Sequence, residues 1–447
     1  MDHSSVDVAH IRSLFDFGDR IVTNNAASTQ PPVAVLDLYR DLTRTYENVH
    51  RGQSSASQLT TARFEAAFDT VSAWLNAAGP ETISMHRNTT EAINAVMYTL
   101  LTEFRDGDNV VTTLMEHNSN YVPWYGLCRE ILPRFGVRVE CRVARFDHET
   151  GELDLPHLAS LVDDRTKLVA CTGASNFLGT KPPLAAVRAI ADSSGYRQPS
   201  GERRSLLLVD GAQLVASTPV DVQALDLDYL AFSFHKLYAP FGVGVLYARE
   251  SIRSGSVPFL YGGDMIAEGQ VTPHRVEYND LPWKFSAGTP NILGVIASAQ
   301  TMRYLVDLAD PHLHLFGTER TLSHPAAARA ITRMAAHTAR LTGYTVAELS
   351  SIPGLRIYGP RAGRPRAPLV AFNVSGHSPF ALAAALDARG VEARAGCHCA
   401  TLAHHDLRMD PAASCRLSFA VYNSEDDVDR AVSAVKDAVR GRVAIAV

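Results

Sequence analysis

The chain has 447 residues, a formal net charge of −5 and a sequence pI near 6.4. Hydrophobic residues make up 46% of it and charged residues 20%, which suffices for a sizeable core in about two or three domains. The slight negative charge argues against binding to nucleic acid or to an anionic membrane, and the lack of an apolar run of about 18 residues argues against a membrane span.

Strand-like and helix-like segments alternate through the middle of the chain. A segment with helical spacing, 183–192, lies among apolar runs that predict short buried strands. These runs are 109–114, 167–171, 206–209 and 229–234. Uninterrupted apolar strands between helices predict an α/β fold with a mostly parallel sheet covered on both faces. The polar residues 193–205 predict an exposed loop.

A second region begins near residue 310. A helical stretch rich in Ala and Arg is expected over about 310–350, followed by a strand over 367–374 and a helix over 379–389. Ser424 is expected to cap a last helix, because three acidic residues follow it and the helix dipole favours acids in a first turn.

These segments divide the chain into two expected domains. The large α/β domain covers 31–305, and the smaller α/β domain covers 306–447 and carries the loop RAGCHCA, 394–400. Residues 1–30 are expected to form an N-terminal segment that packs with the small domain.

The six cysteines indicate a compartment. They are too few in 447 residues for a disulfide scaffold, so a reduced, cytoplasmic protein is the simplest interpretation. The first ten residues, MDHSSVDVAH, hold no basic segment followed by an apolar one, so no signal peptide is expected.

Polar side chains follow four of the strand-like runs. The stretches are RNTTEAIN (87–94), MEHNSN (115–120), VDGAQ (209–213) and SFHK (233–236). Open α/β sheets bind ligands at the carboxyl ends of their strands, so these stretches are the candidate site.

Asp210 and Lys236 end two of these runs. A surface lysine is the simplest interpretation of Lys236 alone. A buried lysine, however, loses its proton easily and forms Schiff bases, and a carboxylate facing a pyridine nitrogen keeps that nitrogen protonated. The two residues together therefore match the protein side of pyridoxal-phosphate (PLP) chemistry. The threonines of RNTTEAIN, at an expected helix start, suit either a phosphate or a simple N-cap.

The chain resembles the class V aminotransferase family of PLP enzymes (fold type I), and within it the cysteine desulfurase and selenocysteine lyase branch. The matching stretches run from about residue 20 to 437 in one order. Besides the four above they are TNNAAST (23–29), ENVHRG (47–52), MEHNSNYVPW (115–124), ASNFLGT (174–180), DYLAFSFHKLYAPFGVGVLY (228–247), FSAGTPN (285–291), RAGCHCA (394–400) and CRLSFAVYN (415–423).

The resemblance implies a PLP site with a role for each matching position. Lys236 carries the cofactor as an aldimine, Asp210 pairs with the pyridine nitrogen, Gln213 contacts the ring hydroxyl oxygen and His117 stacks on the ring. The expected phosphate contacts are Thr90, Ser233 and His235, with Thr89 nearby.

Partners and substrate follow from the same resemblance. Thr289 completes the phosphate site of the neighbouring subunit, which implies a homodimer with shared active sites. Asn176 and Arg416, with Arg394 close by, bind the carboxylate of an amino-acid substrate, as arginine grips carboxylates bidentately.

Cys399 matches the loop cysteine of the desulfurase branch. That role makes its thiolate the nucleophile that takes the sulfur of L-cysteine as a persulfide and passes it to an acceptor, for which a sulfur-acceptor protein is the expected partner. Arg394 and neighbouring histidines are expected to stabilise the thiolate. Inert packing is one alternative for Cys399. A metal site is another, but the spacing C-x-C fits zinc poorly, so no metal is expected. Cys397 stands where this branch often carries histidine.

Several positions depart from the pattern of the branch. Asn24 stands where Asp is usual, Phe234 and Ala239 where Gly is usual, and 53–57 where a histidine-containing stretch is common. These departures leave open a PLP enzyme with another reaction on a specialised substrate, namely an aminotransferase, an epimerase or a β-eliminating C–S lyase. A non-catalytic sulfur carrier or metal-binding module is the remaining alternative.

Overall fold

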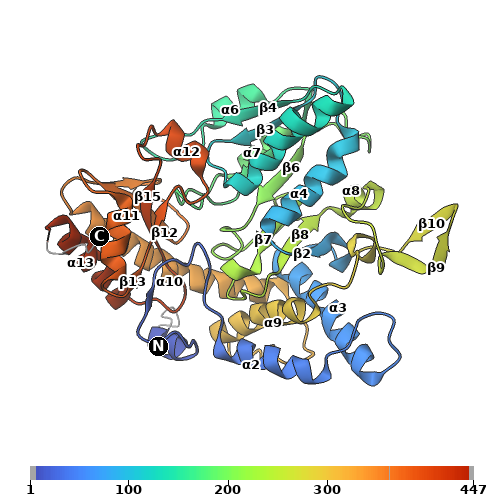
Figure 1. Cartoon of the computed structure of the whole chain (residues 1–447), viewed down its shortest axis with the longest axis horizontal. Coiled ribbons are helices and arrows are strands. Elements are labelled where there is room, and N and C mark those ends of the chain that lie inside the picture. Colours follow the sequence, from blue (N-terminus) through green and yellow to red (C-terminus); the bar gives the residue numbers. More distant parts are fainter. Residues whose placement is uncertain (1–6, 362, 442–447) are drawn as a thin grey trace.

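A computed structural model of the chain describes residues 7–361 and 363–441 and has a seven-stranded sheet at its centre (Figure 1). In spatial order the strands are β2 (Ile83–His86), β8 (Gly244–Ala248), β7 (Tyr229–Ser233), β6 (Leu206–Asp210), β5 (Thr166–Thr172), β3 (Asn109–Thr113) and β4 (Glu140–Ala144). The strands from β7 to β4 are parallel, and β8 runs antiparallel to both β7 and β2. The predicted α/β fold with a mostly parallel sheet is confirmed.

Both faces of this sheet are buried, which explains the uninterrupted apolar runs. In β6, Leu206 and Leu208 join the core on the side of α4 (Thr89–Leu100). Leu207 and Val209 point to the opposite face, in the core that includes α3 (Ser55–Leu75) and α9 (Ile292–Ala309). Successive side chains of a strand face opposite ways, so a strand covered on both sides is apolar throughout.

The expectations for the middle of the chain hold, with one exception. The four predicted strands correspond to β3, β5, β6 and β7, and the predicted helix to α7 (Leu184–Asp192). Residues 193–205 contain neither helix nor strand, as predicted. They are not simply exposed, however, because Tyr196 and Gln198 are buried. The Tyr196 hydroxyl donates to Asp108 at 3.0 Å, which holds the loop against the sheet.

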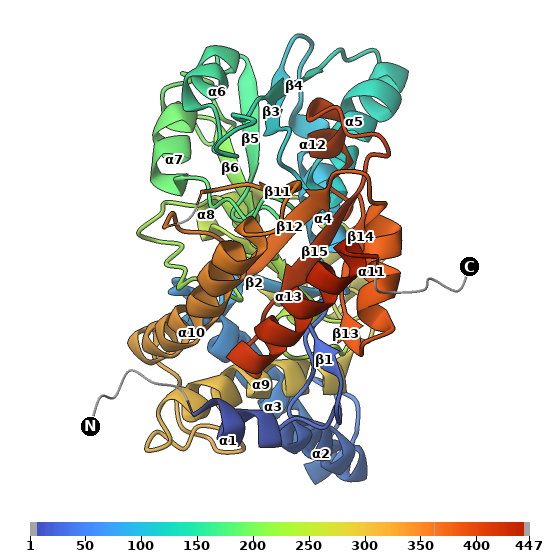
Figure 2. The same cartoon turned by 90° about the vertical axis from the view of Figure 1, so that its left-hand side faces the viewer.

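A four-stranded sheet forms the core of the C-terminal region. Its order is β11 (Leu355–Tyr358), β12 (Leu369–Val374), β15 (Ser414–Ser418) and β14 (Arg394–Gly396). Figure 2 shows α10 (His324–Ser350), α11 (Pro379–Asp387) and α13 (Glu425–Val439) around these strands. Ser424 caps α13 in a capping box with Asp427, as the acidic first turn predicted. The strand and helix expected over 367–374 and 379–389 are confirmed.

The helix expected from residue 310 begins only at His324. Side chains of α9 bind the intervening backbone instead. Arg303 donates to the carbonyl of Leu315 at 3.0 Å and of Thr318 at 2.8 Å, and Asp307 accepts the N–H groups of residues 315 and 316. Because these side chains satisfy backbone N–H and C=O groups of the segment, the segment needs no helix to do so. The residue pattern alone does not show these distant contacts and therefore placed the helix start too early.

We propose that the two larger sheets mark two domains. The expected division after residue 305 falls inside α9, so we place it in the segment 310–323 that follows this helix. The N-terminal segment contacts the smaller sheet region, since β1 (Ile21–Val22) pairs in parallel with β13 (Val391–Glu392) and Arg12 forms an ion pair with Asp427 at 3.0 Å. These contacts support the expected packing for residues 7–30, whereas residues 1–6 of that segment lie outside the described residues.

The remaining elements lie at the periphery. A hairpin of β9 (Ile266–Thr272) and β10 (Arg275–Tyr278) projects from the large sheet region (Figure 1). The other helices are α1 (Val8–Ser13), α2 (Val33–Leu42), α5 (Val122–Gly126), α6 (Leu155–Leu161), α8 (Glu250–Gly255) and α12 (Thr401–Asp406).

Among the described residues, no helix has both the length and the apolar character that a membrane crossing requires.

Candidate active site

A cavity of about 250 Å³ lies at the carboxyl edge of the seven-stranded sheet. Turns that follow β2, β3, β5, β6 and β7 line one side, and residues from β14, β15 and the loop between them line the other. Every predicted site residue lies in this lining except Gln213 and Thr289. The predicted residues present are Thr89, Thr90, His117, Asn176, Asp210, Ser233, His235, Lys236, Arg394, Cys399 and Arg416.

Asp210 and Lys236 come together because their strands are parallel neighbours. Asp210 ends β6, and Lys236 ends the short 3-10 turn Phe234–Lys236 that follows β7. Burial raises the pKa of Asp210, and the cation of Lys236 opposes this rise. Burial lowers the pKa of Lys236 to about 8, although Asp210 acts in the other direction. Lys236 is half-buried and lines the cavity, so a surface lysine does not describe it.

Hydroxyl groups gather where α4 begins. Asn88 caps the helix, so the alternative of a threonine cap is wrong. Thr89 donates its N–H to the Ser233 hydroxyl at 2.7 Å, and the two hydroxyls lie 2.6 Å apart. The hydroxyls of Thr90 and Ser119 lie 2.7 Å apart. Four hydroxyls at the positive end of a helix suit a phosphate.

His117 is held on the loop after β3 by its buried neighbour Glu116. The Glu116 carboxylate accepts the Thr113 hydroxyl at 2.6 Å and the backbone N–H of Thr172 at 2.9 Å, which ties the loop to β5. Nδ1 of His117 accepts the N–H of Ser119 at 3.0 Å. Burial and the nearby cations, Lys236 first, lower the His117 pKa to about 3. The imidazole is thus neutral at pH 7, with its hydrogen on Nε2.

Two arginines lie directly opposite one another across β14 and β15. Arg394 pairs in register with Arg416, which is 1% exposed. Arg416 donates to the Asn176 carbonyl at 2.7 Å and to Asn24 Oδ1 at 3.4 Å, but its Nε has no partner among the described residues. Burial lowers the Arg416 pKa to about 9, so it remains a cation at pH 7. Like charges placed opposite one another repel, and an anionic ligand between them removes that penalty.

Cys399 lies on a strained loop at the cavity. His398 and Cys399 have φ values of 53° and 56°, a left-handed conformation that costs a non-glycine residue about 1 kcal/mol or more. Two hydrogen bonds of 2.6 Å hold the loop, from Asn118 N–H to the Cys399 carbonyl and from Asn176 Nδ2 to the His398 carbonyl. Because Cys399 is only half-buried and lines the cavity, inert core packing does not describe it.

His398, next to Cys399, does not supply the positive charge that was expected of the neighbouring histidines. Nε2 of His398 and Nε2 of His404 lie 3.1 and 3.0 Å from the Ser414 hydroxyl. Burial and the cation of Arg416 lower the His398 pKa to about 2, so this ring is neutral. Arg394 and Arg416 are therefore the positive groups beside Cys399. In the described ranges, no cluster of three or more His, Cys, Asp or Glu side chains is arranged to hold a metal ion.

Two predicted residues lie outside this cavity. Gln213 is buried and donates to the Ala26 carbonyl at 2.7 Å, in a small neighbouring cavity that Lys236 also lines. Thr289 is exposed and lines a separate cavity, which leaves its expected role in another subunit untested. The resemblance to the family implied no role for Asn88 and Ser119, which also line the cavity. Asn88 belongs to the stretch 87–94 and Ser119 to the stretch 115–120.

The residues that replace the usual glycines lie in the core. Phe234 is 1% exposed and packs on Phe232, with 5.4 Å between the ring centroids. Ala239 is fully buried, and neither residue lines the cavity. Asn24, by contrast, contacts Arg416, so this departure is the one that adjoins the site.

Comparisons with known proteins place this geometry in a family. The model described as Aminotransferase class-V matches residues 21–314 and 313–431. A cysteine desulfurase of Cronobacter sakazakii (strain ATCC BAA-894) is 39% identical over 412 residues, covering 92% of this chain and 91% of its own. One from Dickeya dadantii (strain 3937) is 37% identical over 420 residues, covering 92% and 90%.

Comparison with solved structures leads to the same family. The crystal structure of the cysteine desulfurase CsdA from Escherichia coli superimposes with a TM-score of 0.81 at 30% identity, and the apo cysteine desulfurase from Thermococcus onnurineus NA1 with 0.84 at 29%. Each match covers 98% of this chain and 99% of the other. The predicted resemblance is confirmed: the chain belongs to the class-V aminotransferase family.

Proposed function

We propose that the chain is a PLP-dependent cysteine desulfurase that cleaves the C–S bond of L-cysteine. The observation that carries this proposal is that Cys399, Lys236, Asp210 and the pair of opposed arginines line one cavity. The names of the relatives described above support the same activity.

The residues present fit PLP on two structural grounds. The hydroxyl cluster at the start of α4 suits its phosphate, and the buried Asp210 with the half-buried Lys236 suits its ring nitrogen and aldehyde. Lys236 would hold the cofactor covalently. The other proposed contacts are Asp210 to the ring nitrogen, Gln213 to the ring hydroxyl, His117 to the ring face, and Thr89, Thr90, Ser233 and His235 to the phosphate. When bound, PLP supplies an electron sink for an amino acid that loses its α-proton.

The side chains of the cavity bind and orient the substrate. Arg416 and Arg394 hold the carboxylate of L-cysteine, and Asn176, whose Oδ1 is buried without a partner among the described residues, lies beside it. Lys236, with its pKa lowered to about 8, supplies an amine that accepts the α-proton near neutral pH. The neutral His117 donates from Nε2 without adding positive charge.

Cys399 takes the sulfur. Its thiolate attacks the sulfur of the substrate, so that an S–S bond forms as the Cβ–S bond breaks. The electron pair of the broken bond stays with the carbon skeleton, which leaves as alanine after protonation. The persulfide on Cys399 then transfers its outer sulfur to an acceptor thiol, which we propose belongs to a partner protein of sulfur metabolism.

Two further features belong to the proposal. The chain works as a homodimer in which Thr289 of one subunit reaches the phosphate site of the other, which its exposure in a single chain allows. It works in the cytoplasm, which six free cysteines support.

The test is to measure alanine formation and sulfur transfer from L-cysteine by the wild type, Cys399→Ala and Cys397→Ala. Cys397 is the matched control, because it lies two residues away but does not line the cavity. Loss of sulfur transfer in Cys399→Ala alone supports the mechanism. Unchanged transfer in that variant contradicts it, and sulfide release without a persulfide indicates a β-eliminating lyase. Borohydride reduction and peptide mapping test the covalent bond to Lys236.

A further inference from the structure

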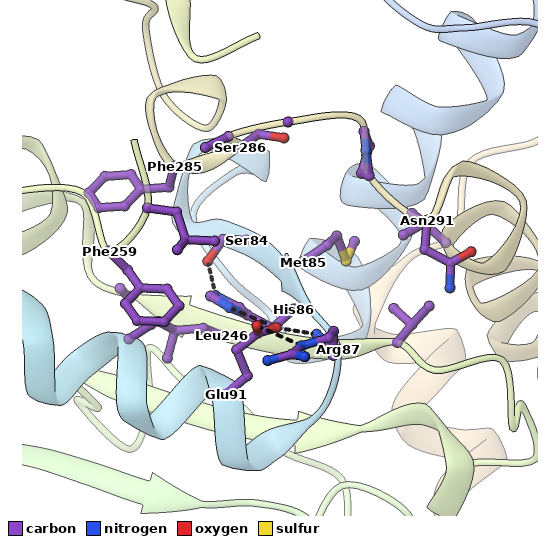
Figure 3. Close-up of a pocket in the computed structure, with 18 of the residues that line it drawn as sticks. Ser84, Met85, His86, Arg87, Glu91, Leu246, Phe259, Phe285, Ser286 and Asn291 are labelled. Atoms are coloured by element: carbon purple, nitrogen blue, oxygen red, sulfur yellow. Dashed lines mark hydrogen bonds and ion pairs between the residues drawn. The ribbon is translucent and has the colours of Figure 1, made fainter. Parts of the chain in front are cut away.

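A second cavity, of about 260 Å³, shares no lining residue with the candidate active site. It lies between β2, β8, one side of α4 and the segment 253–291. Figure 3 shows Phe259 and Phe285 at one end, Asn291 at the other, and the interacting side chains Ser84, His86, Arg87 and Glu91 between them. Aromatic and aliphatic walls with a few polar groups are typical of a ligand site.

Two buried polar groups in this lining lack hydrogen-bond partners. Arg253 is 3% exposed, and its one hydrogen bond among the described residues runs from Nη2 to the Pro282 carbonyl at a long 3.4 Å. Its Nε and Nη1 have no partner there, and neither has the hydroxyl of Tyr229, which is 3% exposed. Buried groups of this kind are normally paired, because leaving them unpaired costs about 1–3 kcal/mol each.

The unpaired nitrogens of Arg253 can only donate, and the Tyr229 hydroxyl can donate or accept. Burial lowers the Arg253 pKa to about 9, so the guanidinium stays charged at pH 7, and burial raises the Tyr229 pKa, so the hydroxyl stays protonated. The carboxylate of the lining, Glu91, is already bound by Arg87 at 2.8 Å and lies 3.9 Å from His86. Arg253 forms no ion pair with any described residue. Arg253 Nε and Nη1 thus lack an acceptor, and an anionic acceptor would also balance the charge of the guanidinium.

The walls define the rest of the ligand. The Phe285 ring lies over the guanidinium, 4.6 Å from Cζ of Arg253, and covers it from solvent on that side. Leu246 and Met85 contribute apolar surface beside it. The volume lies just below the usual range of about 300–1,000 Å³ for small-molecule pockets, so the ligand is small.

We propose that this cavity binds a small carboxylate with an apolar body. The carboxylate accepts hydrogen bonds from Arg253 and Tyr229, and the hydrocarbon part lies between Phe259 and Phe285. A charged partner in a cavity with little solvent is bound more strongly than one at the surface. Within one chain this cavity shares no lining residue with the candidate active site, but its wall includes Thr289, which we place at the phosphate site of the partner subunit, so the test is made on the holoenzyme.

The test is calorimetric titration of the holoenzyme with hexanoate and with benzoate, and with hexan-1-ol as the probe that lacks only the charge. We expect both carboxylates to bind and hexan-1-ol to bind at least tenfold more weakly. Arg253→Met should weaken carboxylate binding about 10- to 100-fold, the loss of charge-assisted hydrogen bonds. Tyr229→Phe should weaken it about 2- to 10-fold, the loss of one neutral hydrogen bond.

Tyr229→Phe keeps the test decisive if Arg253→Met does not fold, because it removes only a hydroxyl that has no partner. Tyr247→Phe is the matched control: Tyr247 is a buried tyrosine of β8 outside the lining, and its change should leave binding unaltered. Failure of both carboxylates to bind, or equal binding of hexan-1-ol, overturns the proposal. So does a crystal structure of the holoenzyme soaked with benzoate in which ordered water, or side chains of a second copy, fill the cavity.

Discussion

Replacement of Arg416 by methionine separates substrate binding from folding in this chain. The guanidinium is 1% exposed, faces Arg394 across β14 and β15, and keeps Nε without a partner among the described residues. Methionine fills a similar unbranched space without charge. If the arginine pair is built for a carboxylate, Arg416→Met should lose affinity for L-cysteine and still fold.

The magnitudes follow from the contacts. Hydrogen bonds to a charged group contribute about 1.5–3 kcal/mol, and each 1.4 kcal/mol is about tenfold. The KM for L-cysteine should therefore rise about 10- to 140-fold. Stability should change little, since loss of the 2.7 Å bond to the Asn176 carbonyl is offset by relief of the repulsion with Arg394 and of the buried charge. We expect the free energy of unfolding to shift by less than about 1.5 kcal/mol.

Initial rates of alanine formation over a range of L-cysteine concentrations give KM, and urea unfolding gives stability. Arg366→Met is the matched control. Arg366 donates to the carbonyls of Leu178 at 3.0 Å and Tyr358 at 2.9 Å and does not line the cavity, so its loss should lower stability and leave KM alone. A folded Arg416→Met protein with the KM of the wild type would refute the assignment of Arg416 to the substrate carboxylate.

Three further predictions test other parts of the account. In cofactor-free protein, the rate at which PLP combines with Lys236 should increase as the pH rises through about 8 instead of 10.5, because only the neutral amine reacts. Stopped-flow absorbance measures this rate. A rate that increases only at about pH 10 contradicts the lowered pKa of Lys236. Phe234→Ala should cost about 3–5 kcal/mol in urea unfolding without raising KM, since the ring fills the core; a raised KM would place it in the site. Ser424→Ala should cost about 1 kcal/mol by removing the cap of α13, and unchanged stability would contradict the capping box.

Sequence patterns located the site better than they described its geometry. Asp210, Lys236 and His117 were predicted to converge because each follows a strand of one parallel sheet, and the cavity contains all three. Gln213, expected on the cofactor ring, also donates to Ala26, a contact 187 positions away that no local pattern indicates. The roles of these residues toward PLP remain predictions.

Local sequence also failed where distant side chains decide the backbone. The helix start at His324 depends on Arg303 and Asp307, which bind the preceding segment. The close approach of the Asn88 turn to β8 depends on Gly244, where a Cβ atom would lie 2.5 Å from the Asn88 backbone. Motif matching alone recovers such a glycine without giving the reason for it.

By itself the sequence determined the fold class, the four strands β3, β5, β6 and β7 and the chemical types that meet at the carboxyl edge of the sheet, because apolar periodicity and strand ends are local properties. Only the tertiary structure decided that Arg394 lies opposite Arg416, that Phe234 faces the core and that Arg253 and Tyr229 lie unpaired in a second cavity. Those outcomes depend on contacts between residues far apart in the chain, because these contacts decide whether a side chain is buried and whether it has a hydrogen-bond partner.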